Sequence, residues 1–454
     1  MVLETAARAA IRDRIGNPPA PALMAIGDGF YNGMRSATID DDKAQLAPPV
    51  LVAAALGETF QPACYPRVVM GDLEQAYRDL AQSAVNVAGL RARILETVAA
   101  WEADLLTEGA RSPAGPALFD NIAVAGAEVD DLIDPKRGSA TAARRMFAGA
   151  LKRFRAASGL PGDELVEMHM GINTAHLLNP HGLPELDGLT QTDWVDIRRP
   201  RRLLVSIGQN DGLTATIMAG KRINVFDRKM AKLPDRMRAL GEALAPALAD
   251  TDQIVLNGLS KPSAVANLRP RAKWPDDQEP GRDPKAKGYW RRYVGYLAGR
   301  GDMTGRDVAE LDEQAAVLSA AAADAFRAGL GQAGERLVVV DLAARMAEVD
   351  RKHRGDAAHA VSVRVKGQDL SLANLILDDE TSSLYGLDNL HLNAVGNGLL
   401  AGWVADAISP GASARIDLQA LADRDRLLQD RPPLLGAGAF LISLLSPFVT
   451  FERI

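Results

Sequence analysis

Five short apolar runs constrain the fold of this chain more than any other feature. They lack regular polar alternation and end in residues typical of turns. This pattern is typical of strands that are buried on both faces of a parallel sheet. The runs are Ala22–Gly27, Asn121–Ala125, Leu203–Ile207, Gln253–Leu256 and Leu337–Val340.

Helical patterns separate these runs. Before the fifth run, Thr304 is placed to cap a helix, since Asp307 follows three residues later. The apolar residues beyond it recur at helical spacings of three and four: Val308, Leu311, Ala315, Leu318 and Ala322. Alternating strands and helices predict an α/β protein, and we expect a three-layer α/β/α sandwich with a mostly parallel sheet.

The length of the chain predicts additional segments around this sheet. The chain has 454 residues, whereas one such domain needs only roughly 200. We expect one domain over residues 20–408, with insertions, mostly helical, at about 71–109, 130–202 and 267–302. A C-terminal extension over residues 409–454 then contains a helix near Ile416–Leu428.

Charge and cysteine content limit the classes of protein to which the chain can belong. The chain has 52 Lys and Arg against 58 Asp and Glu, so no general basic field attracts nucleic acid. A single cysteine, Cys64, excludes an internal disulfide. The first twenty residues lack the apolar core of a secretory signal peptide. We therefore expect a cytoplasmic protein that does not bind nucleic acid; its oligomeric state stays open.

The C-terminal tail has a different character. Residues 434–451 (LLGAGAFLISLLSPFVTF) carry no charge and reach the lower edge of membrane-span length. Gly436, Gly438 and Pro447 weaken a single straight helix. The tail either docks on the protein's own apolar surface, attaches the protein peripherally to a membrane, or binds a partner.

Four sequence blocks place polar residues where an α/β sheet binds ligands, beyond the carboxyl ends of its strands. Taken in order, they resemble the motifs of the SGNH/GDSL hydrolase superfamily, over residues 22–408. The blocks are Ala25–Gly33 (AIGDGFYNG), Asn121–Ala127 (NIAVAGA), Ile207–Asp211 (IGQND) and Asp388–His391 (DNLH).

The resemblance implies acyl transfer from a lipid acyl ester or a carbohydrate O-acyl ester. Such chemistry needs a hydroxyl nucleophile, a base, a carboxylate that orients the base, and donors for the oxyanion. By resemblance, Asp388 is the orienting carboxylate and His391 is the base. Gly126 and Asn210 are the oxyanion donors, and no metal or cofactor is implied.

One departure from the family pattern is decisive. The nucleophilic serine of the family falls on Gly29, which has no side chain and forms no acyl-enzyme. Three interpretations remain open. The chain is an inactive variant of an esterase, a natural pseudoenzyme that binds a lipid, glycan or protein, or an enzyme with another nucleophile, such as water held by His391.

Each site residue also has a purely structural interpretation. Gly126 permits a tight turn, and Asn210 with Asp211 caps a helix that starts at Leu213. Asp388 likewise caps a turn. In the same way, His391 packs as an ordinary core histidine, and Gly29 serves only a strained turn.

Three other groups of residues are candidate binding sites. His169, His176 and His181 lie close in sequence, but Gly171 and Asn173 favour an insertion loop over a metal-binding helix. Asp40–Asp42 lacks the later ligands of a calcium loop. The run Arg198, Arg199, Arg201 and Arg202 is either a solvated strand entrance or a docking site for phosphate groups.

Overall fold

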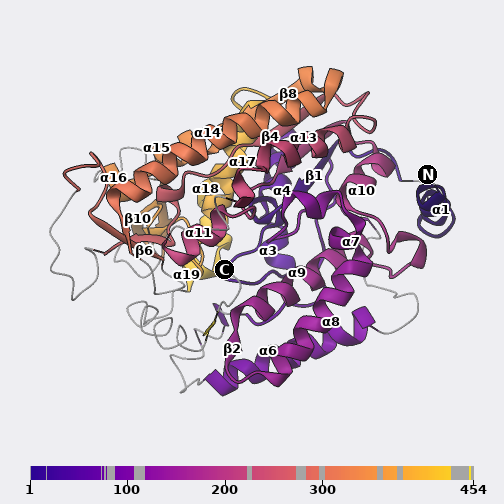
Figure 1. The fold of residues 1–454 in the computed structure, drawn as a ribbon, viewed down its shortest axis with the longest axis horizontal. Coiled ribbons are helices and arrows are strands. Elements are labelled where there is room, and N and C mark those ends of the chain that lie inside the picture. Colours follow the sequence, from indigo (N-terminus) through magenta and orange to yellow (C-terminus); the bar gives the residue numbers. More distant parts are fainter. Residues whose placement is uncertain are drawn as a thin grey trace.

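A computed structural model gives the fold of the chain (Figure 1). It describes residues 2–16, 18–72, 74–75, 78, 87–106, 118–221, 228–271, 283–295, 302–354, 361–375, 382–430 and 449–450. In Figure 1, helix α14 runs along one side of the molecule, while helices α6, α8 and α9 are grouped on the other side.

A parallel sheet of four strands forms the centre, in the order β1-β3-β4-β8. The strands are β1 (Leu23–Gly27), β3 (Arg202–Ser206), β4 (Gln253–Asn257) and β8 (Leu337–Val340). Their bounds lie within one residue of the predicted apolar runs, because both faces of β1, β3 and β4 are buried. The predicted α/β class with a parallel sheet is therefore confirmed.

The remaining predicted run lies along the free edge of β1 without forming a full strand. Asn121 makes one parallel bridge with Ala25. The Ile122 N–H donates to the Ala25 carbonyl at 3.0 Å, and the Val124 N–H donates to the Gly27 carbonyl at 2.8 Å. These bonds bring the second sequence block beside the first.

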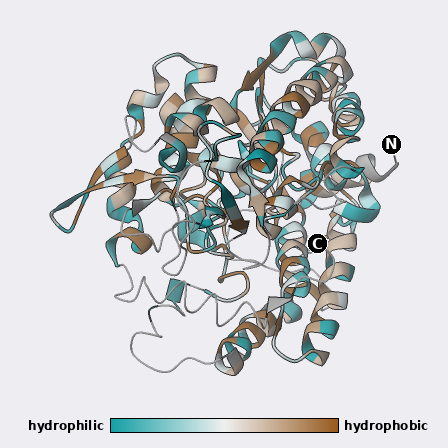
Figure 2. Ribbon diagram, turned by 60° about the vertical axis from the view of Figure 1, so that its left-hand side comes forward, coloured by the Kyte–Doolittle hydropathy of each residue, from teal (hydrophilic) through white to brown (hydrophobic). Residues whose placement is uncertain are grey.

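Helices pack against the sheet and against each other. Helices α4 (Pro48–Leu56) and α17 (Ala394–Ile408) contact each other, and between them they contact β1, β4 and β8. Helix α10 (Gln191–Arg198) contacts β1 and α13 (Leu233–Leu244), and α13 packs on α14 (Gly305–Gly329). Apolar and polar residues alternate along the outer helices, as Figure 2 shows. This alternation is typical of helices with one buried face.

Helix α14 begins where the sequence predicts. The Thr304 side chain accepts the Asp307 N–H, and the Asp307 carboxylate accepts the Thr304 N–H. This reciprocal capping satisfies two N–H groups that a helix N-terminus otherwise leaves unpaired.

The first two predicted insertions contain helices. They are α6 (Val87–Leu106), α7 (Pro135–Gly138), α8 (Ala140–Ala156), α9 (Gly162–Leu178) and α10, with 3₁₀ turns at Val129–Leu132 and Pro184–Leu186. The loop predicted around His169 and His176 is wrong, because both lie in the regular helix α9. A Cβ atom on Gly171 would stand 2.7 Å from the Phe147 Cβ atom of α8, so close helix packing requires this glycine.

Two further sheets of three strands are separate from the central one. The first is antiparallel and contains β5 (Leu268–Pro270), β6 (Arg292–Gly295) and β7 (Met303–Thr304). The second contains β9 (Val361–Val365), β10 (Gln368–Ala373) and β11 (Ser382–Ser383). The shorter helical elements are α1 (Val2–Ala10), a π-helix (Ile11–Ile15), α2 (Gly29–Asn32), α3 (Asp41–Ala44), α11 (Leu213–Ala219), α15 (Leu342–Glu348), α16 (Arg351–Arg354) and 3₁₀ turns at Pro262–Ala264, Gly331–Arg336 and Ala412–Arg415.

The C-terminal extension packs on α17 through one short helix and the 3₁₀ turn Ala412–Arg415. The single helix predicted near Ile416–Leu428 is instead α18 (Leu418–Arg424) and α19 (Arg426–Gln429), divided at Asp425. The apolar tail lies outside the described residues except for β12 (Val449–Thr450), which pairs with β2 (Leu160–Pro161). Among the described residues, no helix is both long and apolar enough to cross a membrane.

Candidate active site

A carboxylate and an imidazole form the core of the candidate site. The Asp388 Oδ2 atom lies 2.9 Å from the His391 Nδ1 atom. The same oxygen accepts the Ala37 N–H at 2.8 Å, and Oδ1 accepts the N–H groups of Leu390 and His391. Asp388 therefore caps its own turn, as the structural interpretation predicted, and also orients the imidazole.

The environment of the pair sets the protonation of both groups. Burial opposes the charge on Asp388, but the His391 charge and the hydrogen bonds outweigh it and lower the pKa of the carboxyl group. Burial likewise opposes a charged His391, but Asp388 raises the pKa of the imidazole above its ordinary value. The pair thus has the electrostatics of a carboxylate-supported base.

Gly29 is the first residue of α2, directly after β1 and Asp28. A Cβ atom on Gly29 would stand 3.0 Å from the His391 Nε2 atom and 3.7 Å from the Ala125 Cβ atom. The first separation is shorter than an ordinary van der Waals contact, so a side chain here would displace the imidazole by a few tenths of an ångström. The structure therefore brings Gly29, Asp388 and His391 together.

Gly126 lies in the turn that follows Ala125. Its φ angle is +91°, a conformation that favours glycine. A Cβ atom there would stand 2.8 Å from the Met170 Sδ atom of α9. The structural interpretation of Gly126 as a turn residue is therefore confirmed, and the turn lies beside Gly29 through Ala125.

The third block is tied to the second by two side chains. The Asn210 Nδ2 atom donates to the Ala127 carbonyl at 3.0 Å, and Asp211 accepts the Val129 N–H. Neither side chain caps α11, which begins at Leu213 without a side-chain cap. An asparagine amide has two N–H donors, so this contact leaves a second donor on Asn210.

Buried acidic groups lie beneath the site. Asp28 is 1% exposed, and its Oδ1 atom accepts from the Phe30 N–H and the Ser206 hydroxyl, each at 3.2 Å. Burial raises the pKa of Asp28 to about 7. Burial and the nearby Glu128 raise the pKa of Asp211 to about 6. Sequence reasoning did not assign Asp28 a role, although its place beside Gly29 was a usable signal.

A buried ionic network supports the loop that carries Asp388. The Arg35 guanidinium lies 2.8 Å from Glu74 and 3.0 Å from Asp425. Ser36 donates to Glu74 at 2.7 Å and accepts the Leu387 N–H at 3.0 Å. Ser36 thus links Glu74 to the loop that carries Asp388. Sequence reasoning missed the network because its members are far apart in the chain.

The other histidine and acidic candidates have structural contacts. His169 is buried beside Asn173, and burial lowers its pKa to about 3. His176 contacts the Tyr65 ring and the Cys64 carbonyl. Asp40 caps α3. Within the described part of the chain, no group of three or more His, Cys, Asp or Glu residues is placed to hold a metal ion.

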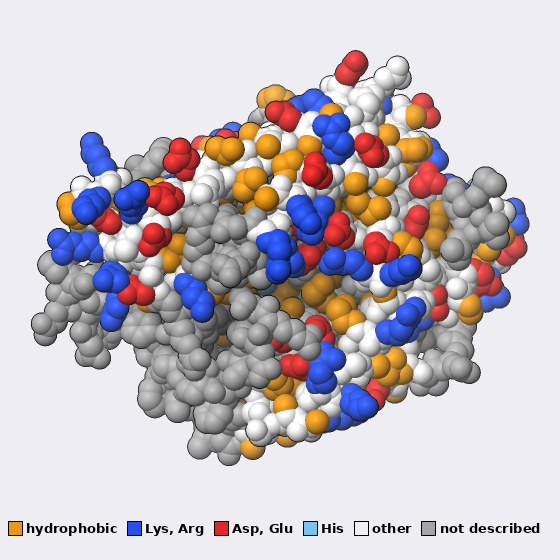
Figure 3. All heavy atoms as spheres, viewed as in Figure 1, with side chains coloured by type: hydrophobic (Ala, Val, Ile, Leu, Met, Phe, Trp, Pro, Cys, Tyr) orange, Lys and Arg blue, Asp and Glu red, His pale blue; other side chains and the backbone are white. Residues whose placement is uncertain are grey.

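The predicted arginine run is neutralised by acidic side chains. The ion pairs are Arg198 with Asp120, Arg199 with Asp196, Arg201 with Asp252 and Arg202 with Glu58. Basic and acidic side chains are also interspersed on the face drawn in Figure 3. These pairings favour the structural interpretation of the run over phosphate docking.

Comparison of the chain with protein-family models, curated proteins and solved structures finds no match. The proposed function therefore depends on the geometry around Gly29.

Proposed function

We propose that this chain carries the active-site frame of an SGNH/GDSL-type ester hydrolase without its nucleophile, and is an inactive variant of an esterase. One observation carries the proposal: the His391 Nε2 atom lies 3.0 Å from the point where a Cβ atom on Gly29 would stand. The strand order and the helices packed around the sheet support the finer assignment of a three-layer sandwich.

In an intact site of this kind, each group has a defined task. A serine at position 29 attacks the ester carbonyl while His391 takes its proton, and Asp388 holds the imidazole in the required tautomer. The Gly126 N–H and the second Asn210 donor stabilise the oxyanion. The proposed ligand is a small-molecule, lipid or glycan ester, and the proposed location is the cytoplasm.

The alternative is a natural pseudoenzyme that binds a lipid, glycan or protein without cutting it. The glycine at position 29 supports this alternative, because binding a ligand through the remaining donors needs no nucleophile. In this alternative, the same donors hold a carbonyl or hydroxyl group of the ligand.

Restoring the nucleophile tests the proposal. We expect Gly29→Ser to hydrolyse short-chain nitrophenyl esters about 10²-fold or more faster than the unmodified chain, because triad members act as a unit. Gly29→Ala is the matched control, since it adds the same Cβ atom without a hydroxyl. Adding His391→Ala to Gly29→Ser should abolish the gain. A folded Gly29→Ser protein that is inactive on a broad ester panel contradicts the hydrolase proposal.

A further inference from the structure

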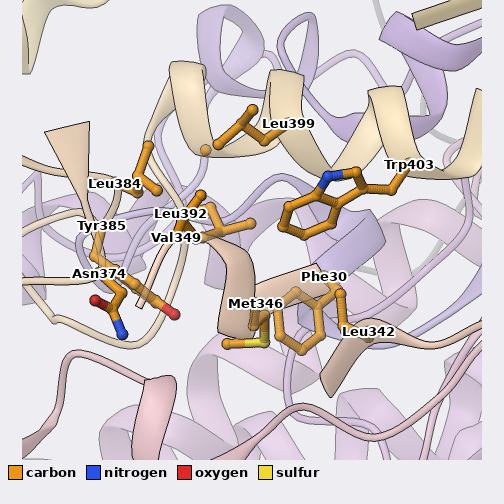
Figure 4. A pocket seen from close by; sticks show the side chains of 11 residues that line it. Phe30, Leu342, Met346, Val349, Asn374, Leu384, Tyr385, Leu392, Leu399 and Trp403 are labelled. Atoms are coloured by element: carbon orange, nitrogen blue, oxygen red, sulfur yellow. The ribbon is translucent and has the colours of Figure 1, made fainter. Parts of the chain in front are cut away.

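An apolar crevice adjoins the candidate site, between α2, α15 and α17 (Figure 4). In the figure, Trp403 reaches from α17 toward Phe30 and Met346, while Asn374 and Tyr385 lie at the other end. The crevice has a volume of about 20 Å³. A cavity needs roughly 10–15 Å³ to hold one water-sized group, so there is room for only one or two such groups.

The crevice and the reacting centre share the same two chain segments. Phe30 directly follows Gly29, and Leu392 directly follows His391; both line the crevice. Phe30, Leu392 and Trp403 are half-buried, as is Gly29, whereas the lining at the far end is buried. The half-buried lining residues thus include the two that follow Gly29 and His391 in the chain.

The lining of the crevice offers few hydrogen-bonding groups to a bound ligand. Three of its side chains carry polar atoms: Asn374, Tyr385 and Trp403. The Asn374 amide already donates to the Ala264 carbonyl at 2.8 Å and to Asp350 at 3.2 Å. The remaining lining side chains are aliphatic, aromatic or thioether groups. A charged or strongly hydrated group would lose its water here without gaining a partner.

We propose that this crevice binds the acyl part of a short-chain ester, of the size of an acetyl group. The inference rests on the proposed function, because it places the ester carbonyl between Gly29 and His391. Longer acyl chains would have to displace Met346 or Leu399, and overfilling a packed apolar site is unfavourable.

Chain-length preference tests the crevice in the Gly29→Ser background. We expect kcat/KM to fall at least about tenfold from nitrophenyl acetate to nitrophenyl hexanoate, since even one methylene too many costs about tenfold or more in a tight apolar pocket. Leu399→Ala should enlarge the crevice and shift the preference toward hexanoate about tenfold. The matched control is Leu400→Ala, on the same helix in the core outside the crevice, which should keep the acetate preference. An identical profile in Leu399→Ala and Gly29→Ser overturns the inference.

Binding to the unmodified chain separates this inference from the hydrolase proposal. We expect ethyl acetate to change the fluorescence of Trp403, with no such change in Trp403→Phe or in Val349→Phe, which fills the crevice. If Trp403 responds to ethyl acetate but Gly29→Ser hydrolyses no ester, the binding role of the crevice is supported and only the hydrolase proposal is overturned. Hydrolysis by Gly29→Ser without any response of Trp403 overturns only the crevice.

Discussion

The His391 Nε2 atom lies 3.0 Å from the point at which a Cβ atom on Gly29 would stand, although the two residues belong to opposite ends of the described domain. The imidazole reaches this position because Asp388 holds its other nitrogen at 2.9 Å. The proposed hydrolase site lacks one hydroxyl group, and each of the groups that remain can be tested.

Removing the charge of Asp388 should lower the pKa of His391 in the unmodified chain. Asp388→Asn keeps a hydrogen-bonding side chain but loses the carboxylate, so only the charge of Asp28 then opposes the effect of burial, and the pKa of the imidazole falls. NMR titration of the histidine ring protons measures the change. Asp350→Asn is the matched control, since it removes the carboxylate beside His353, 2.7 Å from its Nδ1 atom. An unchanged His391 titration contradicts the pairing.

The role of Asn210 is tested in the Gly29→Ser background. Loss of one oxyanion donor typically lowers kcat about 10²–10³-fold, so Asn210→Ala should do so with little change in KM. Gln209→Ala is the control, because this neighbouring amide is occupied by Ser260. A fall in kcat of less than about threefold would show that Asn210 only ties the second and third blocks together.

Asp28 should make stability depend on pH. Its pKa is about 7 in the folded protein against an ordinary 3.8, so the folded state binds the proton more tightly. The stabilisation of the folded state by protonated Asp28 is therefore complete below about pH 4 and is lost as the pH rises through about 7. Relative to the unmodified chain, Asp28→Asn should become more stable between pH 5 and 8, by at most about 4 kcal/mol at about 1.4 kcal/mol per pKa unit.

Urea unfolding of Asp28→Asn and of the unmodified chain at pH 5 and pH 8 measures this difference in the free energy of unfolding. Asp324→Asn, at a largely exposed carboxylate, is the control and should show none. A stability difference between Asp28→Asn and the unmodified chain that stays constant with pH would show that the buried carboxyl group does not titrate in this range.

The buried network behind the Asp388 loop should be costly to break. Asp425 is fully buried, pairs with Arg35, and accepts the Ala394 N–H at 2.9 Å. Asp425→Ala should lower the free energy of unfolding by about 3–5 kcal/mol, because it leaves a buried charge without one of its partners. The exposed pair of Glu310 with Arg306 gives the control, since Glu310→Ala should cost less than about 1 kcal/mol. Equal effects of the two changes would contradict a structural role for the network.

The central sheet could be predicted closely from the sequence. Fully buried strands leave apolar runs without polar alternation, and β1 and β4 lie within one residue of such runs. The relation of Asp388 to His391 was also predictable, because both groups lie in one short turn. The placement of Gly29 against His391 depended on the order of the four blocks, since no local pattern links segments so far apart.

Other features depended on packing partners that no local pattern reveals. Gly171 argued against a helix around His169, but the glycine is there because Phe147 packs closely on α9. The break between α18 and α19 was missed because Asp425 is used for long-range contacts with Arg35 and α17. Local propensity yields to tertiary contacts at both positions.

Covalent labelling at position 29 tests the central claim most directly. A fluorophosphonate reacts with a serine hydroxyl only when a neighbouring base activates it. We predict that mass spectrometry finds the phosphonyl group on the introduced serine of Gly29→Ser, and finds none in Gly29→Ala or after His391→Ala is added to Gly29→Ser. Absence of the label in a folded Gly29→Ser protein, or equal labelling without the His391 imidazole, would contradict the account.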